Sequence, residues 1–121
     1  MNDGSQHRSL SLERWSALPF EQQILAAGNE MNRALAMVRL GHWDRARSSY
    51  ERVLRLIDLS VAAASTRGRR RELLRWRDLA AALYLDPTVP LAAHQQAFRA
   101  LLQFTPSSAL QISPLLGRFA G

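Results

Sequence analysis

The chain has 121 residues, no cysteine and a formal net charge of +6. This length suits a single domain with one modest hydrophobic core. The absence of cysteine excludes disulfides, thiolate metal ligands and a cysteine nucleophile. No apolar run is long enough to cross a bilayer, and residues 1–11 contain no signal-peptide core, so we expect a cytoplasmic protein with no membrane partner.

The composition and the hydrophobic periodicity predict an all-α protein. Alanine and the aliphatic residues dominate the apolar content of 47%, aromatic residues contribute only 7%, and alternating runs of strand type are absent. We expect a small antiparallel bundle of four main helices, arranged up and down or as stacked hairpins, with loose tails. The predicted divisions are a flexible N-terminal tail at residues 1–17, a helical bundle at 18–105, and a short helical turn with a C-terminal tail at 106–121.

The first helix is predicted between Pro19 and Gly41. Apolar side chains at intervals of three and four residues form one stripe from Phe20 to Val38. Pro19 suits a first helical turn, because its missing N–H costs nothing there. Gly41 suits the position just after the last turn. Gly28 indicates the close approach of a neighbouring helix, since glycine within a helix otherwise lowers its stability by about 1 kcal/mol.

Three further helices are predicted by the same periodicity. The second and third occupy residues 43–61 and about 70–85, with a turn at Gly68 between them. Two prolines in residues 86–90 interrupt helical structure, so a loop is expected there before the fourth helix at 90–102. Side chains expected to be largely buried where the first three helices meet are Trp43, Tyr50, Leu54, Leu73, Trp76 and Leu83. On the outer face, Glu51 and Arg55 are expected to form an i,i+4 ion pair.

The C-terminal residues are rich in apolar side chains. Thr105 and Pro106 are expected to cap a short turn at residues 107–112, and apolar residues continue to Phe119. A four-helix domain this small has more apolar surface than it can bury alone. The tail should therefore either fold over the bundle or take part in a homodimer.

Residues 41–58 carry a turn glycine followed by aromatic, small, aliphatic and acidic positions at fixed spacing: Gly41, Trp43, Ala46, Tyr50, Leu54 and Asp58. Together with the preceding helix, in which Ala34 takes the small position, residues 27–58 resemble a single tetratricopeptide-type helical hairpin. Arg33 stands where that family prefers leucine, and no second copy is present, whereas stable arrays need about three repeats. The resemblance implies a TPR-like hairpin that contacts other proteins.

The layout of the chain is also similar to the flagellin export chaperone family. That family combines a hairpin on a glycine-containing turn with a third helix that ends in Leu-Tyr. The matching residues here are Asn32 to Leu59 and Arg71 to Leu85, including Leu83-Tyr84. The third helix is shorter than in that family, and the proline-rich loop departs from its pattern. The resemblance implies chaperone-like binding of another protein.

The histidines and acids show no catalytic or metal-binding pattern. His7, His42 and His94 form no H-E-x-x-H motif and no i,i+4 pair. No arginine precedes a histidine with the four to six intervening residues that HEPN-type ribonucleases use. We therefore predict no enzymatic activity, no metal ion and no cofactor. His42 is expected on a surface turn and His94 in a partly buried helical position.

All sixteen basic residues are arginine, and six of them are set against a single acid, Glu72, in one segment: Arg67, Arg69, Arg70, Arg71, Arg75 and Arg77. The other ten arginines are matched by nine acids, so this segment carries nearly all of the net charge. Arginine is unfavourable at a helix N-terminus, and an external anion would compensate: an acidic protein surface, phosphate groups or a second subunit. The alternative is a solvated helix start whose counter-charges lie nearby, such as Asp78 or Asp86.

These features predict a non-enzymatic helical protein–protein interaction module, an adaptor or chaperone-like protein, with the six arginines as partner-binding residues. The alternative is a nucleic-acid-associated protein that contacts phosphates through Arg67–Arg77. Electrostatic binding of nucleic acid weakens steeply with salt, whereas an apolar contact between helices changes much less.

Overall fold

The computed structural model describes residues 12–120, with side chains up to residue 117. Its labelled helices are α2 (Phe20–Leu40), α3 (Trp43–Ala63), α4 (Arg67–Leu85), α5 (Leu91–Leu102), α6 (Pro106–Ala109) and α7 (Ile112–Ala120). A shorter helix, here called the N-terminal helix, precedes them at residues 12–17. No strand occurs in the described part of the chain, and the predicted all-α class is confirmed.

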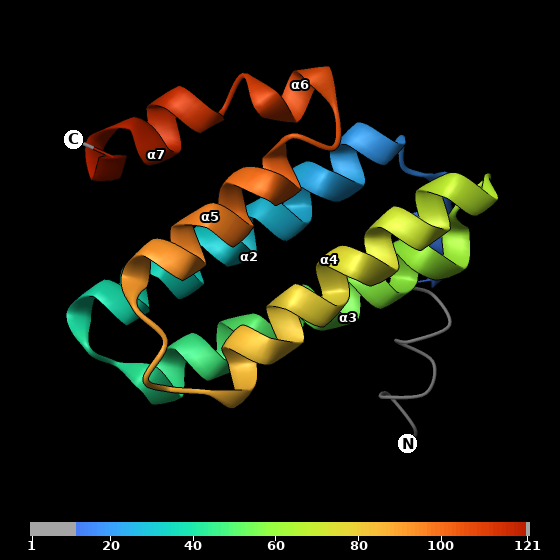
Figure 1. Ribbon diagram of the computed structural model, residues 1–121. Coiled ribbons are helices and arrows are strands. Elements are labelled where there is room, and N and C mark those ends of the chain that lie inside the picture. Colours follow the sequence, from blue (N-terminus) through green and yellow to red (C-terminus); the bar gives the residue numbers. More distant parts are fainter. Residues whose placement is uncertain (1–11, 121) are drawn as a thin grey trace.

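The four main helices form an antiparallel bundle in two layers (Figure 1). The α2–α3 hairpin makes one layer, and α4 with α5 makes the other. Each helix packs against the next in the chain, and α5 returns to pack against α2, which closes the ring. This closed arrangement is that of an up-down bundle. None of the described helices is both long and apolar enough to cross a membrane.

Two glycines have the structural roles predicted for them. Gly41 adopts a left-handed conformation with φ of 78° and ends α2. Its N–H donates to Val38 O at 3.1 Å, and the N–H of His42 donates to Met37 O at 2.9 Å. Glycine is favoured there because it has no Cβ to clash. A Cβ on Gly28 would lie 3.2 Å from Leu102 Cδ2, so α5 does approach α2 closely at this point.

Buried apolar side chains from all four main helices form one core, with Tyr50, Phe98 and Ile57 among the largest. Four of the six residues predicted for the core are buried: Tyr50, Leu73, Trp76 and Leu83. The other two, Trp43 and Leu54, are only partly buried. Leu54 lies at the border of the α3 stripe, whereas Ile57 occupies its centre.

The turn between α3 and α4 lies earlier in the chain than predicted. Thr66 caps α4, because its side-chain oxygen accepts a hydrogen bond from the backbone N–H of Arg69 at 3.1 Å. Gly68 is therefore in the first turn of the helix rather than in the connection. As a result, Arg67 and Arg69 belong to α4.

Residues 12–17, which the sequence places in the N-terminal tail, form a helix that packs on the bundle. Trp15 in the N-terminal helix is buried, and its indole N–H donates to Ser60 Oγ at 2.8 Å. The Gln23 amide donates to the backbone carbonyls of Trp15 and Leu18 at 2.9 and 3.2 Å. These contacts fasten the N-terminal helix to α2 and α3. The rest of the predicted tail, residues 1–11, lies outside the described residues.

The C-terminal segment folds over the bundle, the first of the two outcomes expected for it (Figure 1). Thr105 caps α6 as predicted, accepting a hydrogen bond from the N–H of Ser108 at 3.0 Å. α6 contacts α2 and α5, and α7 contacts α5, where Leu116 is buried. The side chain of Phe119 lies outside the described residues.

The contrast between Ile57 and Leu54 gives a stability test of the core. We expect Ile57→Ala to lower the free energy of unfolding by about 2–5 kcal/mol, because it leaves a cavity in a fully buried site. Leu54→Ala should cost clearly less, since its side chain is partly solvated. Urea denaturation of both variants measures the difference, and equal losses would contradict this assignment of the α3 faces.

Candidate functional site

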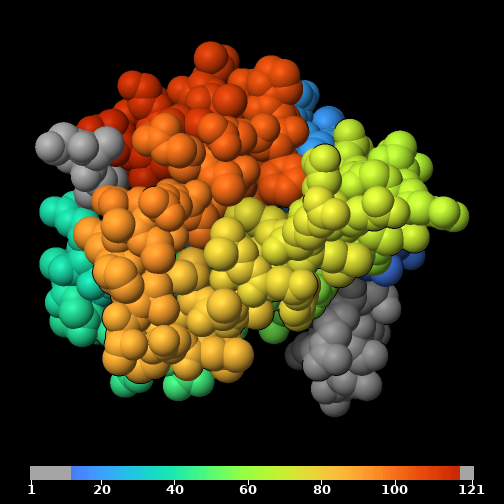
Figure 2. Space-filling view, viewed as in Figure 1, coloured from blue at the N-terminus to red at the C-terminus, as the bar shows by residue number. Residues whose placement is uncertain are grey.

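The surface of α4 is the main candidate, because one face of this helix packs on the bundle and the other is uncovered. Leu73, Trp76, Ala80 and Leu83 form the buried face. The Trp76 indole N–H donates to Ala97 O in α5 at 2.8 Å, which fixes the rotation of α4. Figure 2 shows the outer surface of α4, in yellow-green to yellow, running uncovered along the front of the molecule.

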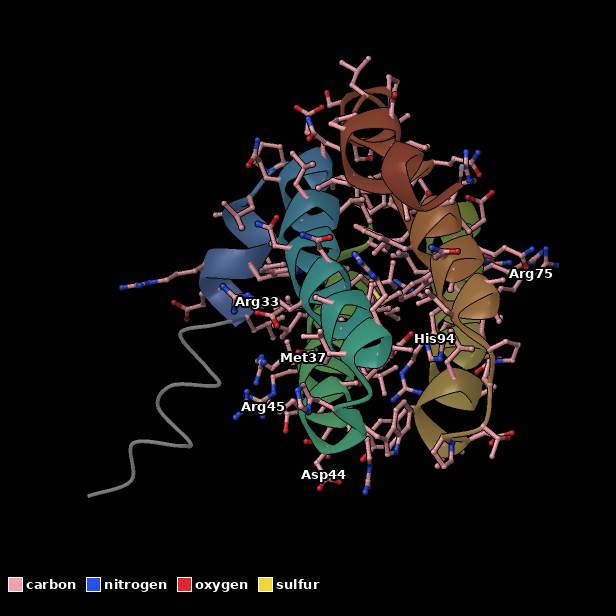
Figure 3. The ribbon with its side chains drawn as sticks, turned by 90° about the vertical axis from the view of Figure 1, so that its left-hand side faces the viewer. Arg33, Met37, Asp44, Arg45, Arg75 and His94 are labelled. Atoms are coloured by element: carbon pink, nitrogen blue, oxygen red, sulfur yellow. The ribbon has the colours of Figure 1, made fainter. Side chains whose placement is uncertain are left out.

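Four of the six predicted site residues lie exposed on α4, here called the outer arginines: Arg67, Arg70, Arg71 and Arg75. Arg67, Arg71 and Arg75 recur every four residues and therefore share one side of the helix. None of the four forms an ion pair with any residue that the structure describes. In Figure 3, Arg75 projects away from the bundle.

The other two predicted site residues are held by contacts within the protein. Arg77 donates to both carboxylate oxygens of Asp58 in α3, at 2.5 and 3.3 Å. This hydrogen bonding raises the pKa of the Arg77 guanidinium. The Arg69 guanidinium lies over the Phe20 ring, 3.9 Å from its centroid, in a cation–π contact. Arg69 and Arg77 therefore connect α4 to α2 and α3 and are less available to a partner.

The acid that pairs with an arginine of this segment is Asp58, which binds Arg77, rather than Asp78 or Asp86. Asp86 instead orders the loop before α5, accepting hydrogen bonds from the N–H and hydroxyl of Thr88 at 2.9 and 2.6 Å. These bonds lower the pKa of the Asp86 carboxyl. Only one of the six arginines is thus neutralised by an ion pair in the described chain.

Two leucines interrupt the charge on the uncovered face of α4. Leu74 is 43% exposed and lies one helical turn after Arg70 and Arg71. Leu79 is 45% exposed and lies one turn after Arg75. The outer surface of α4 therefore combines unpaired guanidinium groups with apolar side chains.

A second group of arginines was missed by the sequence analysis, because its members are far apart in the chain and are balanced by nearby acids. These residues line two hollows on the α2–α3 side of the molecule, of about 350 and 330 Å³, which share Arg52: Arg14, Arg33, Arg45, Arg52 and Arg55. Figure 3 shows Arg33 and Arg45 on the opposite side of the bundle from Arg75. Within this group, Glu30 pairs with Arg52 at 2.9 Å and with Arg33 at 3.2 Å.

The predicted ion pair between Glu51 and Arg55 does not form. Glu51 instead accepts a hydrogen bond from the Tyr84 hydroxyl at 2.8 Å, which links α3 to α4. The Arg47 guanidinium lies 5.3 Å from the centroid of the same tyrosine ring. Arg55 is thereby left without an ion pair among the described residues.

The buried polar pair Tyr50–His94 is structural. The Tyr50 hydroxyl and His94 Nδ1 lie 2.6 Å apart, and both side chains are buried. Burial raises the pKa of the Tyr50 hydroxyl and lowers the pKa of the His94 imidazole. His94 is 1% exposed, more buried than predicted, while His42 lies exposed at its turn as predicted. A neutral, enclosed imidazole of this kind is poorly placed to exchange protons with a substrate.

No group of three His, Asp or Glu side chains within residues 12–120 is arranged to hold a metal ion. Comparisons with protein-family models, with curated protein sequences and with solved structures find no match to this chain.

The two kinds of arginine on α4 should differ in their effect on stability. Arg77→Gln removes the pair with Asp58 and should lower the free energy of unfolding by about 0.5 kcal/mol, because the pair is partly solvated. Arg75→Gln is the matched control on the same helix and should leave stability unchanged or slightly higher. Thermal unfolding of both variants provides the comparison. If Arg75→Gln lowered the free energy of unfolding as much as Arg77→Gln, Arg75 would also be structural.

The burial of His94 predicts a loss of stability in acid. The pKa of folded His94 lies below its ordinary value of 6.5, so the unfolded chain binds a proton at a higher pH than the folded one. The stability that the folded protein gains with a neutral His94 is fully present above pH 6.5 and is lost as the pH falls below that value. His94→Gln should remove this part of the pH dependence, so the stability gap to the original protein narrows in acid. His42→Asn is the control, because His42 is exposed. A difference in stability between His94→Gln and the original protein that stays constant from about pH 8 to pH 5 would contradict the prediction.

Proposed function

We propose that this chain is a non-enzymatic, cytoplasmic helical interaction module, adaptor or chaperone-like, which binds an acidic and partly apolar surface of another protein through α4. The observation that carries the proposal is the position of Leu74 among Arg70, Arg71 and Arg75 on the uncovered face of the helix. Arginine is enriched among the residues that dominate binding at protein interfaces, and the fully buried core of an interface is more apolar than its rim. A TPR-like or export-chaperone-like relationship would agree with this role.

The charge of this face favours an anionic partner. The outer arginines have no ion pair in the described chain, and no acid lies in the first turn of α4. The charges of Arg67 and Arg70 oppose the helix dipole in the first turn, and all four charges repel one another, so an external carboxylate would be stabilised there. Guanidinium groups bind carboxylates in bidentate geometry.

Nucleic acid is the second candidate, because the outer arginines could equally contact phosphates. Against it stand Leu74 and Leu79, since a phosphate backbone gains little from exposed leucine side chains. For a phosphate-binding surface, the logarithm of the binding constant would fall linearly with the logarithm of the salt concentration, with a slope set by the number of phosphates neutralised.

The test uses two variants of α4 with the full chain. Replacing the four outer arginines with glutamine should retain helical content by circular dichroism and keep or raise the melting temperature, because like charges at the helix start are removed. Binding of the protein partner recovered by affinity capture from the host should fall sharply. Unfolding of this variant would show that the arginines are structural and would refute the proposed site.

Leu74→Ser separates the two candidates. Its effect on a protein partner should be a loss of about tenfold or more in affinity, because an apolar contact at the centre of the interface is removed. Its effect on retention by double-stranded DNA at low salt should be negligible. Retention of DNA that depends on the outer arginines, with no protein partner that depends on Leu74, would favour the nucleic-acid alternative.

A further inference from the structure

The hollow next to the N-terminal helix is a separate feature, on a different face from the outer surface of α4. It lies between the N-terminal helix, α2 and α3 and has a volume of about 350 Å³. That size falls in the range of about 300–1,000 Å³ found for small-molecule sites. We call it the N-terminal pocket.

The apolar part of the N-terminal pocket is formed by Trp15, Leu18, Leu56 and Leu59. Its N-terminal wall is fixed, because Trp15 is 8% exposed and bonded to Ser60, and because Gln23 holds the carbonyls at the end of the N-terminal helix. The pocket therefore exists without a ligand, and binding would cost little rearrangement of the wall.

The charged part of the N-terminal pocket consists of Glu30 and three arginines, Arg14, Arg52 and Arg55. Glu30 is occupied by two ion pairs, with Arg52 and with Arg33 outside the pocket. Arg14 and Arg55 form no ion pair with the residues described. Two guanidinium groups thus remain beside an apolar surface.

We propose that the N-terminal pocket binds a small amphipathic carboxylate. The apolar portion of the ligand lies against Trp15, Leu56 and Leu59, and its carboxylate accepts hydrogen bonds from Arg14 and Arg55. Charge-assisted hydrogen bonds from guanidinium groups are the strong ones in such sites. Because these guanidinium groups stand beside an apolar wall, an anion that also carries an apolar portion fits the pocket better than a free phosphate ion does.

In the first experiment the full chain is titrated with octanoate. Binding is measured by calorimetry and by the NMR signal of the Trp15 indole N–H. Octanol and acetate are the comparisons, since each carries only one of the two features. Octanoate should bind about tenfold more tightly than either, because it alone uses both the apolar wall and the arginines. Equal binding of octanoate and octanol, or no change at Trp15, would overturn the proposal.

Arginine variants identify the groups that hold the carboxylate. Arg55→Gln and Arg14→Gln should each weaken octanoate binding by about tenfold and leave octanol binding unchanged. Arg75→Gln, on the opposite side of the bundle, is the matched control and should have no effect. The proposal fails if Arg75→Gln weakens binding as much as Arg55→Gln does.

A peptide chain end is a second source of the same chemistry, since a C-terminal leucine offers an apolar side chain and a carboxylate. The dipeptide acetyl-Ala-Leu and its C-terminal amide form this arm of the experiment. Tighter binding of the free acid than of octanoate assigns the site to chain ends, and the reverse order assigns it to free acids. Either order supports an amphipathic carboxylate as the ligand, whereas a failure of both acetyl-Ala-Leu and octanoate to bind refutes the proposal.

Discussion

The hydrogen bond between Tyr50 and His94 is the point around which the bundle is organised. It joins α3 to α5, helices that lie diagonally across the ring, and it does so inside the core. A buried hydroxyl or imidazole without a hydrogen-bond partner costs about 1–3 kcal/mol. Keeping this pair together therefore restricts both the rotation of α3 and α5 and their displacement along their axes. The same requirement is met throughout the described chain, in which no buried side-chain nitrogen or oxygen lacks a hydrogen-bond partner. The Trp76 contact with Ala97 and the Trp15 contact with Ser60 extend this polar framework to α4 and to the N-terminal helix.

No arginine is buried among the residues that the structure describes, and the rotation of each helix decides which arginines find partners. On α4 the buried stripe passes through Leu73, so positions one turn before and after it, Arg69 and Arg77, lie at the border with neighbouring helices. These two contact Phe20 and Asp58. The remaining arginines of the segment are exposed and form no ion pair with the residues that the structure describes. The division between structural and available arginines thus follows from the same helical period that builds the core.

Much of the fold follows from local patterns in the sequence, and the site follows from them only in part. The turn at Gly41 and the cap at Thr105 depend on residues within a few positions, and both were predicted. The close approach at Gly28 was predicted from the residue type alone, whereas the helix that approaches, α5, is set by tertiary packing. The start of α4 was misplaced because Gly68 is a stronger turn signal than the cap at Thr66, yet the cap determines where the helix begins. The partner of Arg77 could not be derived, since Asp58 is brought close only by the packing of α3 on α4. The arginines around the N-terminal pocket were missed for the same reason. Along the chain they are balanced by nearby acids, but packing brings three arginines and only one acid to the pocket wall.

The shapes of the two basic surfaces determine what each can bind. The outer face of α4 is convex, so it cannot enclose a small molecule, and its exposed leucines lose contact with water only when a broad complementary surface covers them. Another protein supplies such a surface, because interface cores bury apolar side chains beneath a polar rim. The N-terminal pocket is a hollow of about 350 Å³, a volume that suits a small molecule, and its walls belong to three packed elements. The same pair of residue types, arginine beside leucine, therefore underlies both proposals, a protein partner on one side of the bundle and a small ligand on the other.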